Sequence, residues 1–396
     1  MLTVADGTFM LNEKMLYMIN MRKCFFCCLV LTFFLQCCNV VKAKPPRPVW
    51  TSVQANAWYA KQPWIVGSNY LPATAINQLE MWQAETFDPS RIDTELGWAQ
   101  SLGMNTMRVF LHDIVFQLDS AGLMTRIDRF LRIADKHKIR VLFVLFDSVW
   151  DPFPKEGEQR KPAPHVHNSG WVQSPGKKIL MDSTQHYRME RYVRGVIQKF
   201  ATDERILGWD IWNEPDNTND GDYAKNDVPD KAEVVLPLLK KAFLWARQAN
   251  PQQPITAGIW DGNWEVGDSL RPMEKLMIEE SDIISFHNYS SADVFRQKME
   301  QLQRYHKPLI CTEYMARPRG STFAALLPIM KENHVGAINW GFVDGKSQTK
   351  FPWDSWRKSY GDEPPVWFHD VFRTNGTPYD EQEATLIKQL TGLTKK

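Results

Sequence analysis

Apolar runs of six to eight residues recur along the chain, and each is followed by a turn and then by a segment with helical spacing. The apolar runs are residues 64–70, 106–112, 140–147, 206–213, 254–260, 283–289, 308–313 and 336–342. Amphipathic helices are predicted at residues 91–102, 126–138, 187–200 and 231–249. Nearly continuous apolar strands that alternate with helices predict a parallel sheet with helices on both faces.

Eight such units fit between residue 44 and residue 396, without short repeats or low-complexity segments. Their number and order predict one α/β domain over residues 44–396 with a (β/α)8 TIM-barrel fold. The connections after the third and eighth strands, residues 148–184 and 344–367, are long and rich in Trp, and we expect them to be binding elements. A doubly wound open sheet is the alternative, but the glycine-rich first turn typical of that fold is missing.

The first 43 residues differ in character from the rest of the chain. The basic segment Met21-Arg22-Lys23 precedes an uncharged, mostly apolar stretch over residues 24–38, and Val41-Lys42-Ala43 supplies a candidate cleavage site. This order is typical of a secretory signal peptide. We therefore expect residues 1–43 to be an extension and signal peptide that starts at Met21, and the mature protein to be secreted or periplasmic.

Cysteine use agrees with this interpretation, because five of the six cysteines lie within residues 24–38 and only Cys311 remains in the mature chain. One cysteine cannot form an internal disulfide. A lipid anchor on Cys37 or Cys38 is a less favoured alternative, because Gln36 and Cys37 stand where a lipoprotein signal prefers a small residue.

The charge of the chain argues against one class of partner. The 396 residues have a net charge of +1, without a block of Lys and Arg, so we expect no nucleic acid partner. The apolar N-terminal stretch is too short for a membrane span, and we expect a monomer. The 16 Trp and 21 Phe are more unusual, because those near strand ends suggest a surface that stacks against flat apolar faces.

Two glutamates stand at the carboxyl ends of predicted strands. Glu214 follows the fourth strand in the motif Trp-Asn-Glu-Pro, residues 212–215, and Glu313 ends the seventh strand. In a (β/α)8 barrel the active site lies at this end of the strands, and strands four and seven can point both carboxylates into one cleft. Two carboxylates in an apolar cleft are the apparatus of glycoside hydrolysis, in which one holds a proton while the other is ionised.

The Trp-Asn-Glu-Pro motif resembles the acid/base motif of clan A glycoside hydrolases, and the chain from about residue 61 is similar to the family-5, cellulase-type barrels. The resemblance implies that Glu214 is the catalytic acid/base and Glu313 the nucleophile. It also implies substrate-binding residues on strands two, four, six and eight. These are Arg108, Asn213, His287, Tyr289 and Trp340.

The implied residues also have physical roles. Arg108 can form an ion pair with Glu313 and keep it ionised, because a nearby cation lowers the pKa of a carboxylate. Tyr289 can donate a hydrogen bond to the same carboxylate, and Asn213 can bind the 2-hydroxyl group of a sugar. Trp340 can form a flat floor for the sugar ring. A core arginine, a core His-Tyr pair and a packing tryptophan are the structural alternatives.

Three more residues complete the predicted substrate-binding set. His112 ends the second strand, and Asp147 and Trp150 stand after the third strand, where the family has a histidine. Because of this departure the sugar cannot be carried over from the cellulases. We expect no cofactor and no metal, since His165 and His167 lack a third ligand at a recognisable spacing.

The sequence therefore predicts a secreted retaining β-glycosidase that acts on a β-linked oligosaccharide or polysaccharide of the glucan, mannan or xylan class. A carbohydrate-binding barrel without catalytic activity and a transglycosidase are the alternatives.

Overall fold

The structure is a computed structural model that describes residues 45–219, 223–267 and 270–393. The expectations for residues 1–43, including the start at Met21, cleavage after Ala43 and lipid attachment, lie outside the described residues. The chain from Pro46 onward forms one compact unit.

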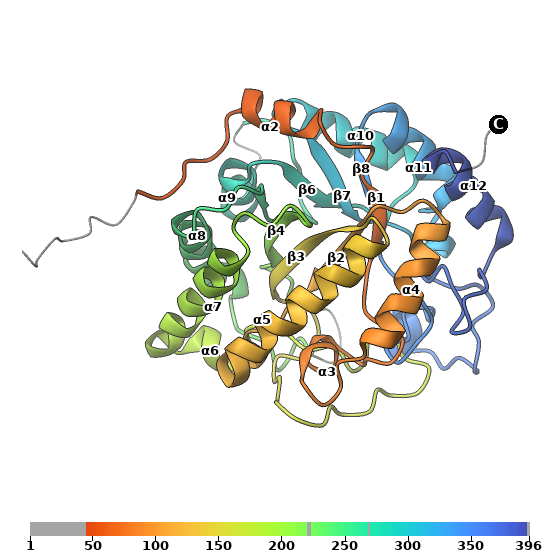
Figure 1. Cartoon of the computed structure of the whole chain (residues 1–396), viewed down its shortest axis with the longest axis horizontal. Coiled ribbons are helices and arrows are strands. Elements are labelled where there is room, and N and C mark those ends of the chain that lie inside the picture. Colours follow the sequence, from red (N-terminus) through yellow and green to blue (C-terminus); the bar gives the residue numbers. More distant parts are fainter. Residues whose placement is uncertain (1–44, 220–222, 268–269, 394–396) are drawn as a thin grey trace, which may run out of the picture. The chain divides into compact units, whose positions relative to one another are not determined.

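A parallel sheet of eight strands forms the centre of the described part of the chain (Figure 1). The strands are β1 (Val66–Asn69), β2 (Thr106–Phe110), β3 (Arg140–Asp147), β4 (Ile206–Asn213), β5 (Ile255–Thr256), β6 (Ile284–His287), β7 (Leu309–Glu313) and β8 (Gly336–Asn339). Their spatial order is β5-β4-β3-β2-β1-β8-β7-β6, so the first strand pairs with the second and with the last. Every residue of β2, β4 and β7 is buried, as expected for strands covered on both faces.

The ring closes between β5 and β6 through a short continuation of β5. Ile259 forms a parallel bridge with Phe286, the Ile259 N–H donates to Ser285 O at 3.1 Å, and the His287 N–H donates to Ile259 O at 2.9 Å. The predicted (β/α)8 TIM barrel is therefore confirmed, together with its long connections after β3 and β8.

Helices surround the barrel (Figure 1). They are α3 (Gln78–Trp82), α4 (Pro89–Ser101), α5 (Asp113–Lys136), α6 (Lys177–Met181), α7 (His186–Lys199), α8 (Lys231–Gln248), α9 (Pro272–Glu280), α10 (Ala292–Gln303), α11 (Phe323–Glu332) and α12 (Glu381–Thr391). The predicted helices at 91–102, 187–200 and 231–249 match α4, α7 and α8 closely.

The helix predicted at residues 126–138 is only the second half of α5, which begins at Asp113. The backbone leaves the helical conformation at Asp119, whose side chain accepts from the Gly122 N–H at 2.8 Å and pairs with Arg126 at 3.1 Å. This kink interrupts the periodic apolar pattern, which explains why the pattern did not reveal the first half of the helix.

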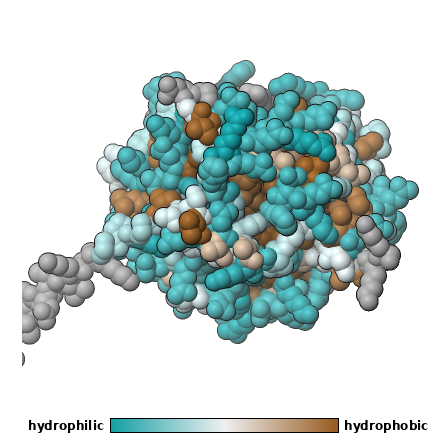
Figure 2. Space-filling view, turned by 90° about the horizontal axis from the view of Figure 1, so that it is seen from above, coloured by the Kyte–Doolittle hydropathy of each residue, from teal (hydrophilic) through white to brown (hydrophobic). Residues whose placement is uncertain are grey.

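The amino ends of the strands are closed by α2 (Ser52–Tyr59). Ala55 of this helix packs with apolar residues near the amino ends of the strands in a separate cluster, and Trp50, Trp58 and Tyr59 pack against it. In Figure 1 this helix lies at the top, and the long connection after β3 lies at the bottom. Figure 2, seen from above, shows a mostly hydrophilic surface with scattered hydrophobic residues. Because α2 covers the amino ends of the strands, the functional end of the barrel is the opposite end, where the strands have their carboxyl ends.

None of the described helices is long and apolar enough to cross a membrane. Cys311, on β7, is buried in the barrel wall.

Candidate active site

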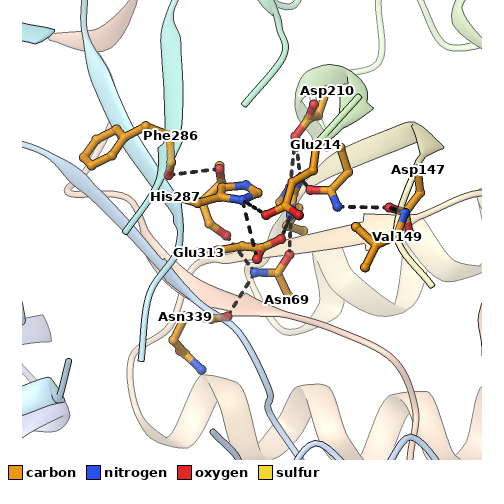
Figure 3. Close-up of polar contacts among 12 residues, drawn as sticks. Asn69, Asp147, Val149, Asp210, Glu214, Phe286, His287, Glu313 and Asn339 are labelled. Carbon is orange, nitrogen blue, oxygen red and sulfur yellow. Dashed lines mark hydrogen bonds and ion pairs between the residues drawn. The ribbon is translucent and has the colours of Figure 1, made fainter. Parts of the chain in front are cut away.

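The two predicted catalytic glutamates face each other at the carboxyl ends of their strands (Figure 3). Glu313 is the last residue of β7, and Glu214 directly follows β4. The backbone of Glu214 has a φ of 44°, in the left-handed region that costs a residue with a Cβ about 1 kcal/mol or more. This turn occurs where the chain leaves the strand and next to the facing carboxylate, which is where strained backbone gathers in active sites.

His287 lies beside both carboxylates. Its Nδ1 is 2.8 Å from Glu214 Oε1 and 3.5 Å from Glu313 Oε2 (Figure 3). One ligand atom from each of the three side chains lies within 4.8 Å of the other two. Burial lowers the pKa of His287 to about 4, so the imidazole is neutral near pH 7 and adds no positive charge to the site.

Arg108 provides the positive charge of the site. Its Nη1 donates to Glu313 Oε1 at 2.9 Å and to Asn69 Oδ1 at 2.9 Å. Its Nε and Nη2 donate to Asp210 Oδ2 at 3.0 and 2.8 Å, and Nη2 also donates to Asn213 Oδ1 at 2.7 Å. The guanidinium is fully buried, and these partners compensate for its lost hydration.

The ionisation of Glu313 reflects two opposed effects. Burial raises the pKa of this carboxyl group, and the neighbouring Glu214 raises it further. Arg108 and the hydrogen bond from Tyr289 act in the opposite direction. Arg108 thus favours the ionised form as expected, but the net shift is upward because the carboxylate is almost completely removed from water.

Glu214 has no such guanidinium contact. Burial raises the pKa of Glu214 to about 7, and the hydrogen bond from Asn217 Nδ2 to its Oε2, at 2.6 Å, opposes this shift. A carboxyl group with a pKa near the working pH can give up and take back a proton. The geometry therefore suits Glu214 to proton transfer and Glu313 to a role that needs a held, oriented carboxylate.

The carboxylate oxygens of Glu214 and Glu313 and a ring nitrogen of His287 are also close enough together to bind one metal ion. Arg108 lies 2.9 Å from Glu313, and its positive charge would repel a divalent cation at that position. The arrangement fits acid/base and nucleophilic catalysis by the carboxyl groups better than metal coordination.

A cavity of about 370 Å³ opens over the two carboxylates. Its lining includes the predicted residues Asp147, Trp150, Asn213, Tyr289 and Trp340. Three further tryptophans, Trp171, Trp260 and Trp353, also line it. Indole rings around a pair of carboxylates form a site that can stack against sugar rings while holding the reacting bond between two acids.

Comparison with known proteins identifies the family. A family model described as cellulase (glycosyl hydrolase family 5) matches residues 82–345, about two thirds of the chain. The chain belongs to glycosyl hydrolase family 5. It is therefore a glycoside hydrolase. A search of curated proteins found no match.

The family-5 enzyme is also similar to solved structures. The endo-β-1,4-mannanase of Thermotoga petrophila has 14% identity and a TM-score of 0.55, over 85% of this chain and 78% of that chain. The endo-1,4-β-mannanase of Rhizomucor miehei has 15% identity and a TM-score of 0.54, over 84% and 95%. The exo-β-1,4-mannosidase of Opitutaceae bacterium strain TAV5 has 18% identity and a TM-score of 0.55, over 89% and 61%. At these identities the likeness shows the common fold alone.

Tyr289 and Asn213 both form hydrogen bonds within the family-5 site, and the Tyr289 contact with Glu313 is the expected one. The Tyr289 hydroxyl donates to Glu313 Oε2 at 2.7 Å. Asn213 donates from Nδ2 to Asp147 Oδ1 at 3.0 Å, while its Oδ1 accepts from Arg108. The amide of Asn213 is therefore held from both sides at the rim of the cavity.

Asp147 is engaged within the family-5 fold as well as lining the cavity. Its carboxylate accepts from Trp171 Nε1 at 2.6 Å, from Asn213 Nδ2, from the Val149 N–H at 3.1 Å and from Gln78 Nε2 at 3.2 Å. Burial raises the pKa of Asp147 to about 7. Asp147 thereby links Trp171, in the long connection after β3, to Asn213 in the active site.

Three predicted binding residues, Arg108, His112 and His287, do not line the cavity, and His112 is the one among them that contacts neither catalytic carboxylate. Its Nδ1 accepts from the Ile114 N–H at 3.2 Å, and its Nε2 lies 3.1 Å from Gln173 O. Burial lowers its pKa, so the ring is neutral. In this family-5 enzyme His112 caps α5 and braces the connection after β3 from behind.

Sequence reasoning missed Asn69, Asp210 and Asn217. Asp210 is the single charged residue of the apolar strand β4, and that isolation was a usable sign of a buried ion pair. Asn69 ends β1 and accepts from Arg108, a position that strand-end reasoning could also have reached. Asn217 lies in the turn after Glu214, and no pattern distinguished it from an ordinary loop residue.

Proposed function

We propose that the protein is a secreted retaining β-glycosidase that hydrolyses a β-linked oligosaccharide or polysaccharide by double displacement. One observation carries this proposal: carboxylate oxygens of Glu214 and Glu313 lie within 4.8 Å of each other. Retaining enzymes have their two carboxyl groups roughly 5–5.5 Å apart, whereas inverting enzymes need roughly 6.5–9.5 Å to admit a water molecule. The close pair supports retention.

In the first step, a Glu313 oxygen forms a bond to the anomeric carbon while the bond from that carbon to the glycosidic oxygen breaks. Glu214 gives its proton to the departing oxygen. In the second step Glu214 takes a proton from water, the water oxygen bonds to the anomeric carbon, and Glu313 leaves as a carboxylate. The change in protonation of Glu214 and the loss and return of the negative charge of Glu313 both occur in one buried site.

The surrounding residues serve these two steps in different ways. Arg108 and Tyr289 each bind one oxygen of Glu313, and so hold the carboxylate in position and stabilise its charge when it departs. The raised pKa of Glu214, about 7, leaves it protonated in much of the free enzyme near neutral pH. That state is the one that the first step requires.

The cavity supports a carbohydrate substrate of the glucan, mannan or xylan class. Mannanases and a mannosidase occur among the similar structures, so β-mannosides are the first compounds to test. A transglycosidase would differ only in passing the sugar to a hydroxyl group other than water. A binding protein without activity is disfavoured, because two facing carboxylates in a buried site are costly unless they act.

Export is part of the proposal and depends on the pattern of residues 1–43. Cleavage after Ala43 would give a mature monomer that begins at Lys44, outside the cell or in the periplasm. N-terminal sequencing of the exported protein tests this, and a lipid-modified start at Cys37 or Cys38 would contradict it.

Proton NMR of the first product tests the chemistry. We expect the β-hemiacetal to form first from 4-nitrophenyl β-mannoside or β-glucoside, and to convert to the α-anomer afterwards. The α-anomer as first product would contradict retention. Binding of sugar without turnover of any glycoside would establish the inactive binding barrel instead.

A further inference from the structure

The connections after β3 and β8 meet over one side of the active-site cavity. We call residues 148–176 the β3 loop and residues 340–380 the β8 loop. Both lie on the side of the barrel away from α2 (Figure 1). Trp150, His167, Asn168 and Trp171 of the β3 loop and Trp340 and Trp353 of the β8 loop line the cavity. The loops therefore form its wall rather than a distant rim.

Hydrogen bonds join the two loops along their length. Gln348 Nε2 donates to Ala163 O at 2.9 Å and to Val166 O at 3.2 Å, and Gln348 Oε1 accepts from the His165 N–H at 2.7 Å. The Asn168 N–H donates to Ser347 O at 3.0 Å. These are short bonds between the backbone of one loop and residues of the other, so separating the loops would leave several polar groups unpaired.

The contact continues toward the cavity. The His167 N–H donates to Ser355 Oγ at 2.9 Å, and His167 Nδ1 lies 2.9 Å from Phe351 O. Next to it the rings of Trp150 and Trp356 stack with centroids 5.1 Å apart and an interplanar angle of 16°. A stacked pair of indoles, one from each loop, bridges the gap between them at this side of the cavity.

The segment after β1 completes the wall. Asn77 Nδ2 donates to Gly170 O at 2.9 Å, and Gln78 Nε2 donates to Val172 O at 3.0 Å. On the other side, the Lys346 N–H donates to Ala73 O at 3.1 Å. Three connections thus bind one another around the β1, β3 and β8 side of the site.

The residues around the two carboxylates show which part of the substrate faces this wall. The sugar that is attacked must lie against Glu313, which lines the walled cavity. The leaving group departs past Glu214, the acid. Glu214 and Trp260, which also line the walled cavity, line a second cavity of about 200 Å³ together with Asp261 and Ser290, and no residue of the β3 or β8 loop lines that one.

We propose that this enzyme attacks chain ends: the walled cavity receives the non-reducing end of a β-linked chain, and the rest of the chain leaves over Trp260 and Asp261. This inference rests on the proposed function and adds its mode of action. A closed wall on the glycone side leaves no exit for a chain that continues in that direction. Hydrolysis then releases a product of one fixed length from the non-reducing end.

The test uses β-1,4-mannopentaose and cellopentaose, each free and with a 4,6-O-benzylidene cap on the non-reducing terminal sugar. The comparison is made with the pentaose built from the sugar whose aryl glycoside the enzyme hydrolyses. We expect the free pentaose to be shortened stepwise, and the capped one to be cut at least roughly 100-fold more slowly, because even a surplus methylene group in a tight pocket costs roughly 10–200-fold. A pentaose reduced with borohydride is the control, and it should be shortened at the rate of the native one.

The failures of the two proposals differ. Hydrolysis of the aryl glycoside together with equal rates on free and capped pentaose, or internal cuts from the first minutes, would overturn the chain-end inference and leave the glycosidase intact. A free pentaose that is not cut at all, although the aryl glycoside is hydrolysed, would likewise overturn the chain-end inference and leave the glycosidase intact. Absence of turnover on every glycoside would overturn the glycosidase itself.

A pair of variants tests whether the wall is the cause. Trp356→Ala removes the ring that stacks on Trp150 and does not line the cavity. We expect it to raise the rate on the capped pentaose relative to the free one at least roughly tenfold. Arg357→Ala, at the exposed neighbouring position, should leave that ratio as in the wild type. An unchanged ratio in both variants would contradict the role of the wall.

Discussion

Replacing Asn217 with alanine should move the activity of the enzyme toward higher pH. Asn217 Nδ2 donates to Glu214 Oε2 at 2.6 Å, and Asn217 Oδ1 accepts from the Asn219 N–H at 2.7 Å, which fixes the orientation of the amide. The bond to Glu214 favours its ionised form and opposes the burial that raises its pKa to about 7. Without this bond the acid should keep its proton to a higher pH.

The size of the shift follows from the strength of the bond. A hydrogen bond to a charged group contributes roughly 1.5–3 kcal/mol, and one pKa unit corresponds to about 1.36 kcal/mol. Complete loss of the bond would therefore raise the pKa of Glu214 by about one to two units. The Glu214 side chain is 11% exposed, so water can replace part of the lost bond. We expect a shift of about one unit.

The assay is the pH dependence of kcat/KM on an oligosaccharide, whose poor leaving group makes the rate depend on the acid. The alkaline limb reports loss of the proton from Glu214, so it should move to higher pH in Asn217→Ala. Asn217→Asp retains an acceptor for the Asn219 N–H but replaces the donor with a negative charge, and should shift the limb further. An alkaline limb that stays in place or moves to lower pH would refute the reasoning, as would a smaller shift for the aspartate variant.

Three other predictions concern the same site. Arg108→Met leaves the buried carboxylates of Asp210 and Glu313 without their cation, and should lower the free energy of unfolding by roughly 3–5 kcal/mol in urea at pH 7; a loss below about 1 kcal/mol would contradict this. Tyr289→Phe removes a hydrogen-bond donor to Glu313, so the pKa of that carboxyl group should rise and the acidic limb of kcat/KM should move to higher pH. We also expect kcat/KM to fall roughly 10–100-fold. An acidic limb that does not move would contradict this prediction. Glu214→Ala should lose roughly 10²–10⁴-fold in rate on an oligosaccharide but far less on a 2,4-dinitrophenyl glycoside, and equal losses on both would mean that Glu214 is not the acid.

Much of the fold was readable from the sequence because barrel strands are buried on both faces and separated by helices of regular spacing. The runs at 140–147 and 206–213 coincide with β3 and β4. The first half of α5 was not predicted, because the kink at Asp119 breaks the helical period. The short α2 was missed as well, since its role as a plug depends on contacts with strand residues that are distant in the sequence.

The site was predictable only where strand topology determines position. Glu214 and Glu313 follow from their places at strand ends, and Arg108 and Tyr289 reach Glu313 as the physical argument predicted. His112 also ends a strand region, but its side chain supports Gln173 instead of facing the cavity. Strand ends alone cannot show the direction of a side chain.

Loop residues were the least predictable part of the site. Asn217 binds the acid from within a turn. The backbone carbonyl oxygen of Asn217 accepts a hydrogen bond from Lys231 Nζ at 2.7 Å. This amine is fully buried at the start of α8. Contacts of this kind depend on how a turn folds back on a helix, and composition or spacing does not encode them visibly.

The configuration of the glycosyl azide formed by two variants tests the assigned roles most directly. On an activated aryl β-glycoside with added azide, Glu313→Ala should give the α-azide, because azide takes the place of the missing nucleophile in one inverting step. Glu214→Ala should give the β-azide, because azide opens the covalent intermediate on Glu313 with a second inversion. NMR of the two products distinguishes the anomers. The reverse assignment, or the same anomer from both variants, would contradict the double displacement with Glu214 as acid/base and Glu313 as nucleophile.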